Sequence, residues 1–182
     1  MPRIRPILDK SGLSPADQAI FDSIIGSRGK IVGPFPLLMH SPEVAGRTAH
    51  LGAQLRFSAS IPKDVTELVI ITTAREMDCA FEWGAHVILA RQVGVREEAI
   101  AAIRDRKAPA GLTPDEAQVV SYVQAVVGKH RVDDASFQAM QARFVVQGII
   151  DLTATSGYYA MLACTMNAFE MEPAPDHDPL PL

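Results

Sequence analysis

The stretch that decides the fold is residues 63–93, which read KDVTELVIITTAREMDCAFEWGAHVILARQV. In its first half, Val65, Leu68, Val69 and Thr72 follow the spacing of one helix face. Asp78 marks a short break, and Gly94 supplies a stop after the second half. We therefore expect a helical hairpin made by residues 63–76 and 79–93.

Start and stop signals outside this hairpin predict further helices. Ser14 followed by Pro15 favours a helix that ends near Ile25, and the Gly and Pro content of residues 26–36 favours a loop. Thr113-Pro114-Asp115-Glu116 has the pattern of a capping box. With no convincing alternating strand pattern, the sequence predicts an all-α fold of about eight helices, the others covering 42–57, 96–104, 114 onward, 134 onward and 148–169.

Composition narrows the class of protein. The 182 residues suggest a single domain over 1–182, with a core of about 12–172 and a proline-rich strap-like or disordered tail at 173–182. Hydrophobic residues make up 48% of the chain, which is enough for a core without a metal or disulfide. The net charge of −4 and the 6% aromatic content argue against nucleic-acid binding.

Localisation is also predicted from composition. The most apolar stretch, residues 145–169, is interrupted by polar side chains and is not expected to span a membrane. The N-terminal residues have no apolar leader segment. We therefore expect a cytoplasmic protein without a membrane partner.

Chemically useful side chains gather on the second helix of the hairpin. Cys79, Glu82 and His86 stand at offsets 0, 3 and 7, which puts them on one helix face. The helix macrodipole favours a thiolate at Cys79. Glu82 and His86 supply an acid and a base without a cofactor, and Glu67 on the preceding helix is placed to orient His86.

This register resembles that of alkylhydroperoxidase D-like proteins, which carry Glu, eleven residues, Cys-x-x-Cys, three residues and His. Here the order is Glu67, eleven residues, Cys79-x-x-Glu82, three residues and His86. The segment 81–86, FEWGAH, is similar to the Tyr-Glu-Trp-x-x-His of carboxymuconolactone decarboxylase-like proteins. The segments 33–35, 40–43 and 157–162 resemble the same family, so the resemblance covers about residues 12–172. It implies an alkylhydroperoxidase D-like helical bundle that forms a homo-oligomer, a trimer or a hexamer.

One departure from the register separates three functional hypotheses. Glu82 stands where the peroxidases have their second cysteine, and Cys164, expected in the core, lies 85 positions after Cys79. The leading hypothesis is a cofactor-independent lyase resembling 4-carboxymuconolactone decarboxylase, an enzyme that acts on a small carboxylated lactone-like molecule. The runner-up is an alkylhydroperoxidase-like, peroxiredoxin-type antioxidant, an oxidoreductase that uses Cys79 with an outside thiol. The third is a non-catalytic helical assembly protein.

In the lyase hypothesis, a few more residues line the substrate pocket. Trp83 and Phe81 are expected to form its wall, with Tyr158 and His40 as further candidates for substrate binding. Arg47, Arg56 and Arg75 could each bind a substrate carboxylate, and the sequence does not choose among them. His50, His130 and His177 have the positions of surface or tail residues, and the histidine spacing suggests no metal site. Neither a metal nor another cofactor is therefore predicted.

Overall fold

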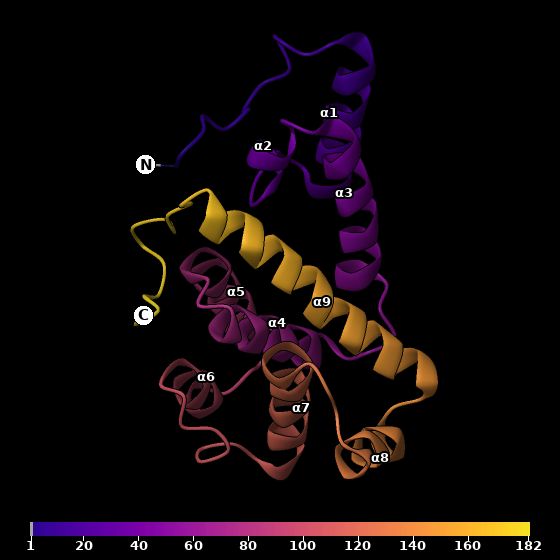
Figure 1. Ribbon diagram of the computed structural model, residues 1–182, viewed down its shortest axis with the longest axis vertical. Coiled ribbons are helices and arrows are strands. Elements are labelled where there is room, and N and C mark those ends of the chain that lie inside the picture. The colour runs from indigo at the N-terminus through magenta and orange to yellow at the C-terminus, as the bar shows by residue number, and fades with distance from the viewer. Residues whose placement is uncertain (1) are drawn as a thin grey trace.

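The computed structural model describes residues 2–182 and is built of helices and connecting loops (Figure 1). The described residues contain no strand, so the all-α prediction is confirmed. The helices are α1 (Pro15–Arg28), α2 (Phe35–Leu38), α3 (Pro42–Phe57), α4 (Lys63–Glu76), α5 (Ala80–Gln92), α6 (Glu97–Arg104), α7 (Pro114–Gln124), α8 (Asp134–Arg143) and α9 (Val146–Ala168), with one π-helical segment at Ala125–Lys129.

Local capping explains why most helices begin where the sequence predicts. The Ser14 hydroxyl accepts a hydrogen bond from the Asp17 amide at the start of α1. At α7, the Thr113 hydroxyl accepts from the Glu116 amide at 3.3 Å while the Glu116 carboxylate accepts from the Thr113 amide at 2.7 Å. This reciprocal pair satisfies two amides that the helix leaves without internal partners.

The region between α1 and α3 differs from the prediction. The helix does not end near Ile25 but continues to Arg28, because Gly29 rather than Gly26 takes the left-handed conformation, with φ 77°. Residues 35–38 then form the short helix α2, where a loop was predicted. Phe35 and Leu37 are buried there, and tertiary packing favours this turn although prolines surround it.

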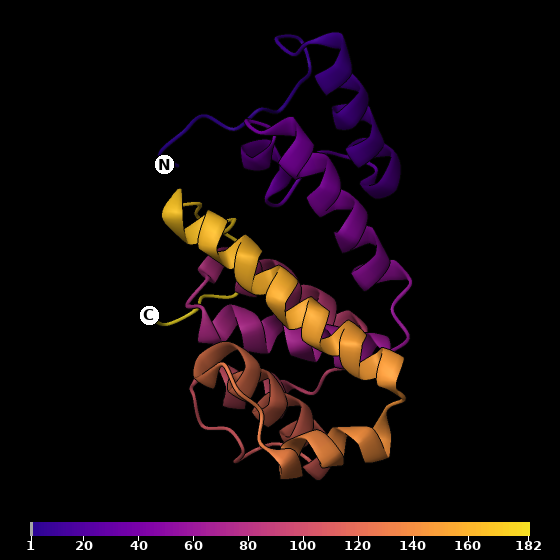
Figure 2. The same ribbon diagram turned by 45° about the vertical axis from the view of Figure 1, so that its right-hand side comes forward.

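The helices form two layers that meet along α9. Helices α1, α2 and α3 lie at one end of the molecule and α6, α7 and α8 at the other, while α9 crosses between them (Figures 1 and 2). Helix α4 packs against α5, α7 and α9. The catalytic candidates on α4 and α5 are therefore carried by the most enclosed part of the molecule.

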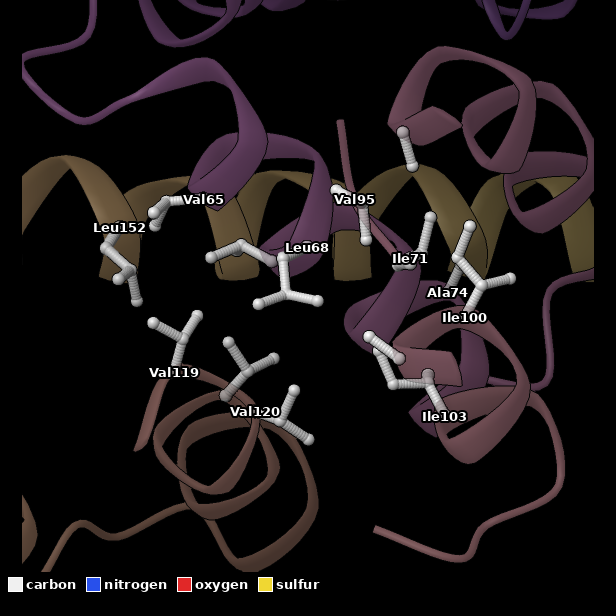
Figure 3. Packing of buried hydrophobic residues seen from close by; sticks show 14 of the residues in the cluster. Val65, Leu68, Ile71, Ala74, Val95, Ile100, Ile103, Val119, Val120 and Leu152 are labelled. Atoms are coloured by element: carbon white, nitrogen blue, oxygen red, sulfur yellow. The ribbon is translucent and has the colours of Figure 1, made fainter. Parts of the chain in front are cut away.

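The main hydrophobic core surrounds α4. Val65, Leu68, Ile71 and Ala74 meet side chains from α6, α7 and α9 there (Figure 3). A fully buried aliphatic side chain stabilises the fold by about 1.5–3 kcal/mol, so this cluster holds the α4–α5 hairpin firmly. A separate cluster around Phe21, Phe35 and Met39 stabilises the N-terminal layer.

The proline-rich C-terminal segment is ordered against the bundle. Leu180 is buried in the main core, and Arg75 Nη1 donates to the Pro181 carbonyl at 2.7 Å. Arg91 of α5 pairs with Asp178. We refer to residues 173–182 as the strap, because they run back from the end of α9 beside α5 (Figure 1). Within residues 2–182, no helix combines the length and apolar character needed to cross a membrane.

Candidate active site

A buried chain of three side chains joins α4 to α5. His86 Nδ1 lies 2.7 Å from Glu67 Oε2, and His86 Nε2 lies 3.6 Å from Glu82 Oε2. Because an ionised carboxylate can only accept, Nδ1–H of His86 donates to Glu67. The Glu67 carboxylate thereby orients the imidazole and leaves Nε2 directed toward Glu82.

Burial sets the protonation of Glu82. Its side chain is almost completely enclosed, and desolvation raises the pKa of the carboxyl above its ordinary value, although nearby His86 opposes the shift. Among residues 2–182, Glu82 Oε1 has no hydrogen-bond partner. Glu82 therefore keeps its proton to a higher pH than an exposed glutamate does, and one of its oxygens is free for a ligand or water.

Two tyrosines of α9 complete the surroundings of His86. The ring of Tyr159 meets the imidazole edge-on, with centroids 4.9 Å apart. Burial raises the pKa of the Tyr158 hydroxyl to about 12, and this hydroxyl donates to the Thr48 carbonyl at 3.1 Å. The tyrosines link α9 to both α5 and α3, so the positions of three helices depend on them.

These residues open onto a cavity of about 650 Å³. Its wall comes from α5 and α9, from the end of α3, from the segment around α2 and from the strap. Glu82 and His86 both line this wall. The wall also contains three cations and five Phe and Tyr rings, which are Arg28, Lys30, Arg56, Phe35, Phe57, Phe81, Tyr158 and Tyr159.

The structure distinguishes among the three arginine candidates. Arg56 lines the cavity and stacks over the neighbouring Phe57 ring at 5.4 Å. Arg47 is exposed on α3 and pairs with Glu43, and Arg75 is buried with its guanidinium on the strap. Of the three, only Arg56 is placed to meet a ligand in the cavity.

The predicted role of Cys79 does not match its placement. Cys79 does not line the cavity but is fully buried beside Leu37, Ala163 and Met166. Burial raises the pKa of its thiol to about 11, and hydrogen bonds from the amides of Glu82 and Phe81 offset this only in part. The prediction that the macrodipole favours a thiolate here is therefore wrong, because desolvation outweighs the helix terminus.

Two residues that were predicted to line the pocket lie elsewhere, and Cys164 does not lie in the core as predicted. Trp83 is in the main core rather than on the cavity wall, and its Nε1 has no partner within residues 2–182. His40 Nε2 contacts the Arg5 carbonyl at 2.9 Å, outside the cavity. Cys164, expected in the core, is exposed on α9. Phe81 and Tyr158 do line the cavity.

Several cavity residues had no distinguishing signal in the sequence. Arg28, Lys30 and His177 come from segments far from the Glu67–His86 register, and only the fold brings them to the cavity. Tyr158 and its neighbour Tyr159 on α9 both line the cavity. No group of three or more His, Cys, Asp or Glu side chains within residues 2–182 has the arrangement of a metal site.

The helical arrangement is that of an alkylhydroperoxidase D-like fold. The structure is similar to that of an uncharacterised peroxidase-related protein with an alkylhydroperoxidase AhpD core from Ralstonia eutropha, with a TM-score of 0.78, 17% identity, and coverage of 96% of this chain and 93% of that chain. It is also similar to a peroxidase-related protein from a Silicibacter species, with a TM-score of 0.75, 16% identity and coverage of 97% and 95%.

The segment that carries the candidate site is also similar in sequence to a known family. Residues 42–125 match the sequence model of the carboxymuconolactone decarboxylase family. A variant of the debrominase Bmp8 in complex with 2,3,4-tribromopyrrole shares the fold, with a TM-score of 0.75, 12% identity and coverage of 96% and 94%. No curated protein matches the chain.

Proposed function

We propose that the protein is a cofactor-independent carboxy-lyase that acts on a small carboxylated, lactone-like molecule by acid/base catalysis. The observation that carries this proposal is the buried Glu67–His86–Glu82 chain, which ends at a cavity containing cations. An oriented imidazole beside a carboxyl of raised pKa is a proton donor and acceptor in the absence of any other group.

The reaction needs little more than this. When the carbon–carbon bond to the carboxylate breaks, its electrons move through the double bond into the lactone carbonyl, and carbon dioxide leaves. The resulting dienolate takes one proton at carbon from the Glu82–His86 pair, and solvent returns that proton to the pair after product release. Glu67 acts on this step by holding the imidazole of His86 in position.

The cationic side of the cavity supports the substrate class. Arg56 and Lys30 line it, and neither forms an ion pair within residues 2–182 that would neutralise it. The side chains of Phe57 and Phe81 also line the cavity and give a ligand apolar surface. A small, flat, anionic molecule fits both features, because guanidinium and ammonium groups bind carboxylates while the rings exclude water.

The peroxidase alternative finds less support. It requires a reactive thiolate at Cys79, but that thiol is enclosed outside the cavity and its pKa is raised to about 11. A neutral, buried thiol is a weak nucleophile toward a peroxide. We therefore favour the acid/base mechanism over the thiol mechanism.

Three variants separate these mechanisms. His86→Ala and Glu82→Gln should each lower the rate of carbon dioxide release from γ-carboxylated unsaturated lactones, by roughly 10²-fold or more, because each removes a positioned proton donor. Cys79→Ser should retain most of this activity, since no step involves the thiol. Consumption of an organic hydroperoxide with added dithiol, lost on Cys79→Ser, would instead establish the peroxidase.

A further inference from the structure

The strap is held against α5 at several points. The Asp178 carboxylate pairs with Arg91 near the end of α5, and the Leu180 side chain is inserted in the main core. Beyond it, the Pro181 carbonyl accepts a hydrogen bond from the buried Arg75 of α4. Because these anchors follow residue 177 closely, they fix the preceding turn, in which the His177 amide donates to the Ala174 carbonyl at 3.0 Å.

A glycine on α5 makes room for this turn. Gly84 lies between Glu82 and His86, and a Cβ atom at that position would stand 2.7 Å from His177 Cβ and 3.0 Å from His177 Nδ1. Any larger residue would therefore push the strap away from the helix that carries the acid and base. The close approach puts both His177 and Ala174 on the cavity wall.

One nitrogen of the His177 imidazole has no hydrogen-bond partner among the described residues. This nitrogen, Nδ1, is buried. Buried polar atoms in folded proteins nearly always have a partner, so an unpartnered one beside a cavity points to a group that arrives with a ligand. The strap thus brings a second histidine to the cavity that contains His86.

We infer that the strap is a permanent wall of the cavity and that His177 is a ligand-binding residue, which donates a hydrogen bond to a small carboxylate held near His86. This inference rests on the proposed function for the class of ligand. The placement of the strap as a wall, which is the structural half of the inference, is independent of the ligand, because it depends on the Gly84 contact and on the anchors at Asp178, Leu180 and Pro181.

The binding half is tested by calorimetric titration with 2-furoate, a planar five-membered ring that carries one carboxylate. His177→Ala should raise the dissociation constant by about 10-fold or more, as expected for loss of a charge-assisted hydrogen bond. His177→Gln, which keeps a donor, should recover part of the affinity. His50→Ala, which removes an exposed histidine of α3, serves as the control and should bind like wild type.

The outcomes separate this inference from the proposed function. If His177→Ala binds 2-furoate like wild type while Arg56→Gln binds it weakly, the role of His177 is overturned and the carboxylate site stands. If wild type binds no 2-furoate at millimolar concentration, the ligand class fails, and with it both the proposed function and the binding role of His177.

The structural half is tested without a ligand, by hydrogen exchange. Gly84→Ala should speed exchange of the His177 amide by about 10-fold or more, because the new methyl group displaces the turn. Gly157→Ala is a matched control, since a Cβ there meets nothing within 4 Å. If Gly84→Ala does not fold, Asp178→Asn takes its place. This variant weakens the Arg91 anchor and should also speed exchange of the His177 amide. Unchanged exchange in the folded variants would overturn the strap as a wall.

Discussion

At the scale of single residues, Glu82 determines how the stability of the protein responds to pH. Burial raises the pKa of this carboxyl in the folded state above that of an unfolded chain, which is about 4.3. The folded state therefore favours the proton, and the resulting stabilisation is complete at low pH and is lost as the pH rises through the folded-state pKa.

In the Glu82→Gln variant, the side chain at position 82 cannot lose a proton. We expect the free energy of unfolding of the variant, relative to wild type, to increase as the pH rises from about 4 to 8. Urea unfolding at a series of pH values measures this difference. Glu43→Gln, which changes an exposed glutamate on α3, is the control and should give a nearly constant difference. A Glu82→Gln difference that falls with rising pH contradicts the assignment.

The two cysteines should also behave differently. Cys79 is buried, with a pKa raised to about 11, whereas Cys164 is exposed. A thiol reagent such as dithiobisnitrobenzoate should therefore modify one thiol quickly in the native protein and the second only after denaturation. Cys164→Ser should abolish the fast phase. A fast phase that survives this substitution would mean that Cys79 is accessible and would revive the peroxidase mechanism.

At the scale of elements, the contact between α3 and α9 depends on Gly52. A Cβ atom at this position would overlap the Tyr158 hydroxyl, which donates to the Thr48 carbonyl. Gly52→Ala should destabilise the protein by about 1–3 kcal/mol, as overpacking of a core commonly does. Because Tyr158 lines the cavity, ligand affinity should fall as well.

A glycine in open space provides the comparison. Gly26 lies in α1, and a Cβ atom there would meet nothing within 4 Å. Gly26→Ala should be neutral or should stabilise the protein by up to about 1 kcal/mol, since alanine favours the helix. Thermal unfolding of both variants measures the contrast. Equal effects would show that the Tyr158 contact does not restrict residue 52.

The helices and the candidate active site could be predicted from the sequence to different extents. Helix starts depend on neighbouring residues, so Ser14 and Thr113 were sufficient to locate α1 and α7. The Glu67–Glu82–His86 geometry was accessible for a similar reason, because one hairpin carries all three. Arg28 and His177 reach the cavity through contacts between segments distant in sequence, which no local pattern contains. The prediction of a thiolate at Cys79 failed because the sequence shows that this residue begins a helix but does not show that its thiol is buried.

At the scale of the whole molecule, an uncovered apolar surface bears on assembly. Val145, Val146 and Ile150 at the start of α9 are 72%, 66% and 60% exposed. They adjoin an apolar groove of about 500 Å³ that Phe137 and Ile149 also line. Patches of this kind on soluble proteins commonly mark association surfaces. The homo-oligomer, a trimer or a hexamer, stays a prediction that this surface supports.

Light scattering tests the assembly. Wild type at micromolar concentration should have a mass several times 19.7 kDa, and Ile150→Asp should reduce it, because a charge in an apolar interface loses its hydration. Leu51→Asp, at an exposed apolar position on α3, is the control and should leave the mass unchanged. A wild-type mass of 19.7 kDa excludes the assembly.

The two-layer arrangement has a consequence for how such a protein can diversify. The proposed acid and base come from the α4–α5 hairpin, whereas the cations Arg28, Lys30 and Arg56 come from the N-terminal layer, which has its own hydrophobic cluster. Evolutionary substitutions can therefore change the cations without changing the carboxyl and imidazole groups of the hairpin. Substitution of Arg28, Lys30 or Arg56 would change the charge that meets a ligand while Glu67, Glu82 and His86 stay the same, so relatives that share these three groups can differ in their substrates.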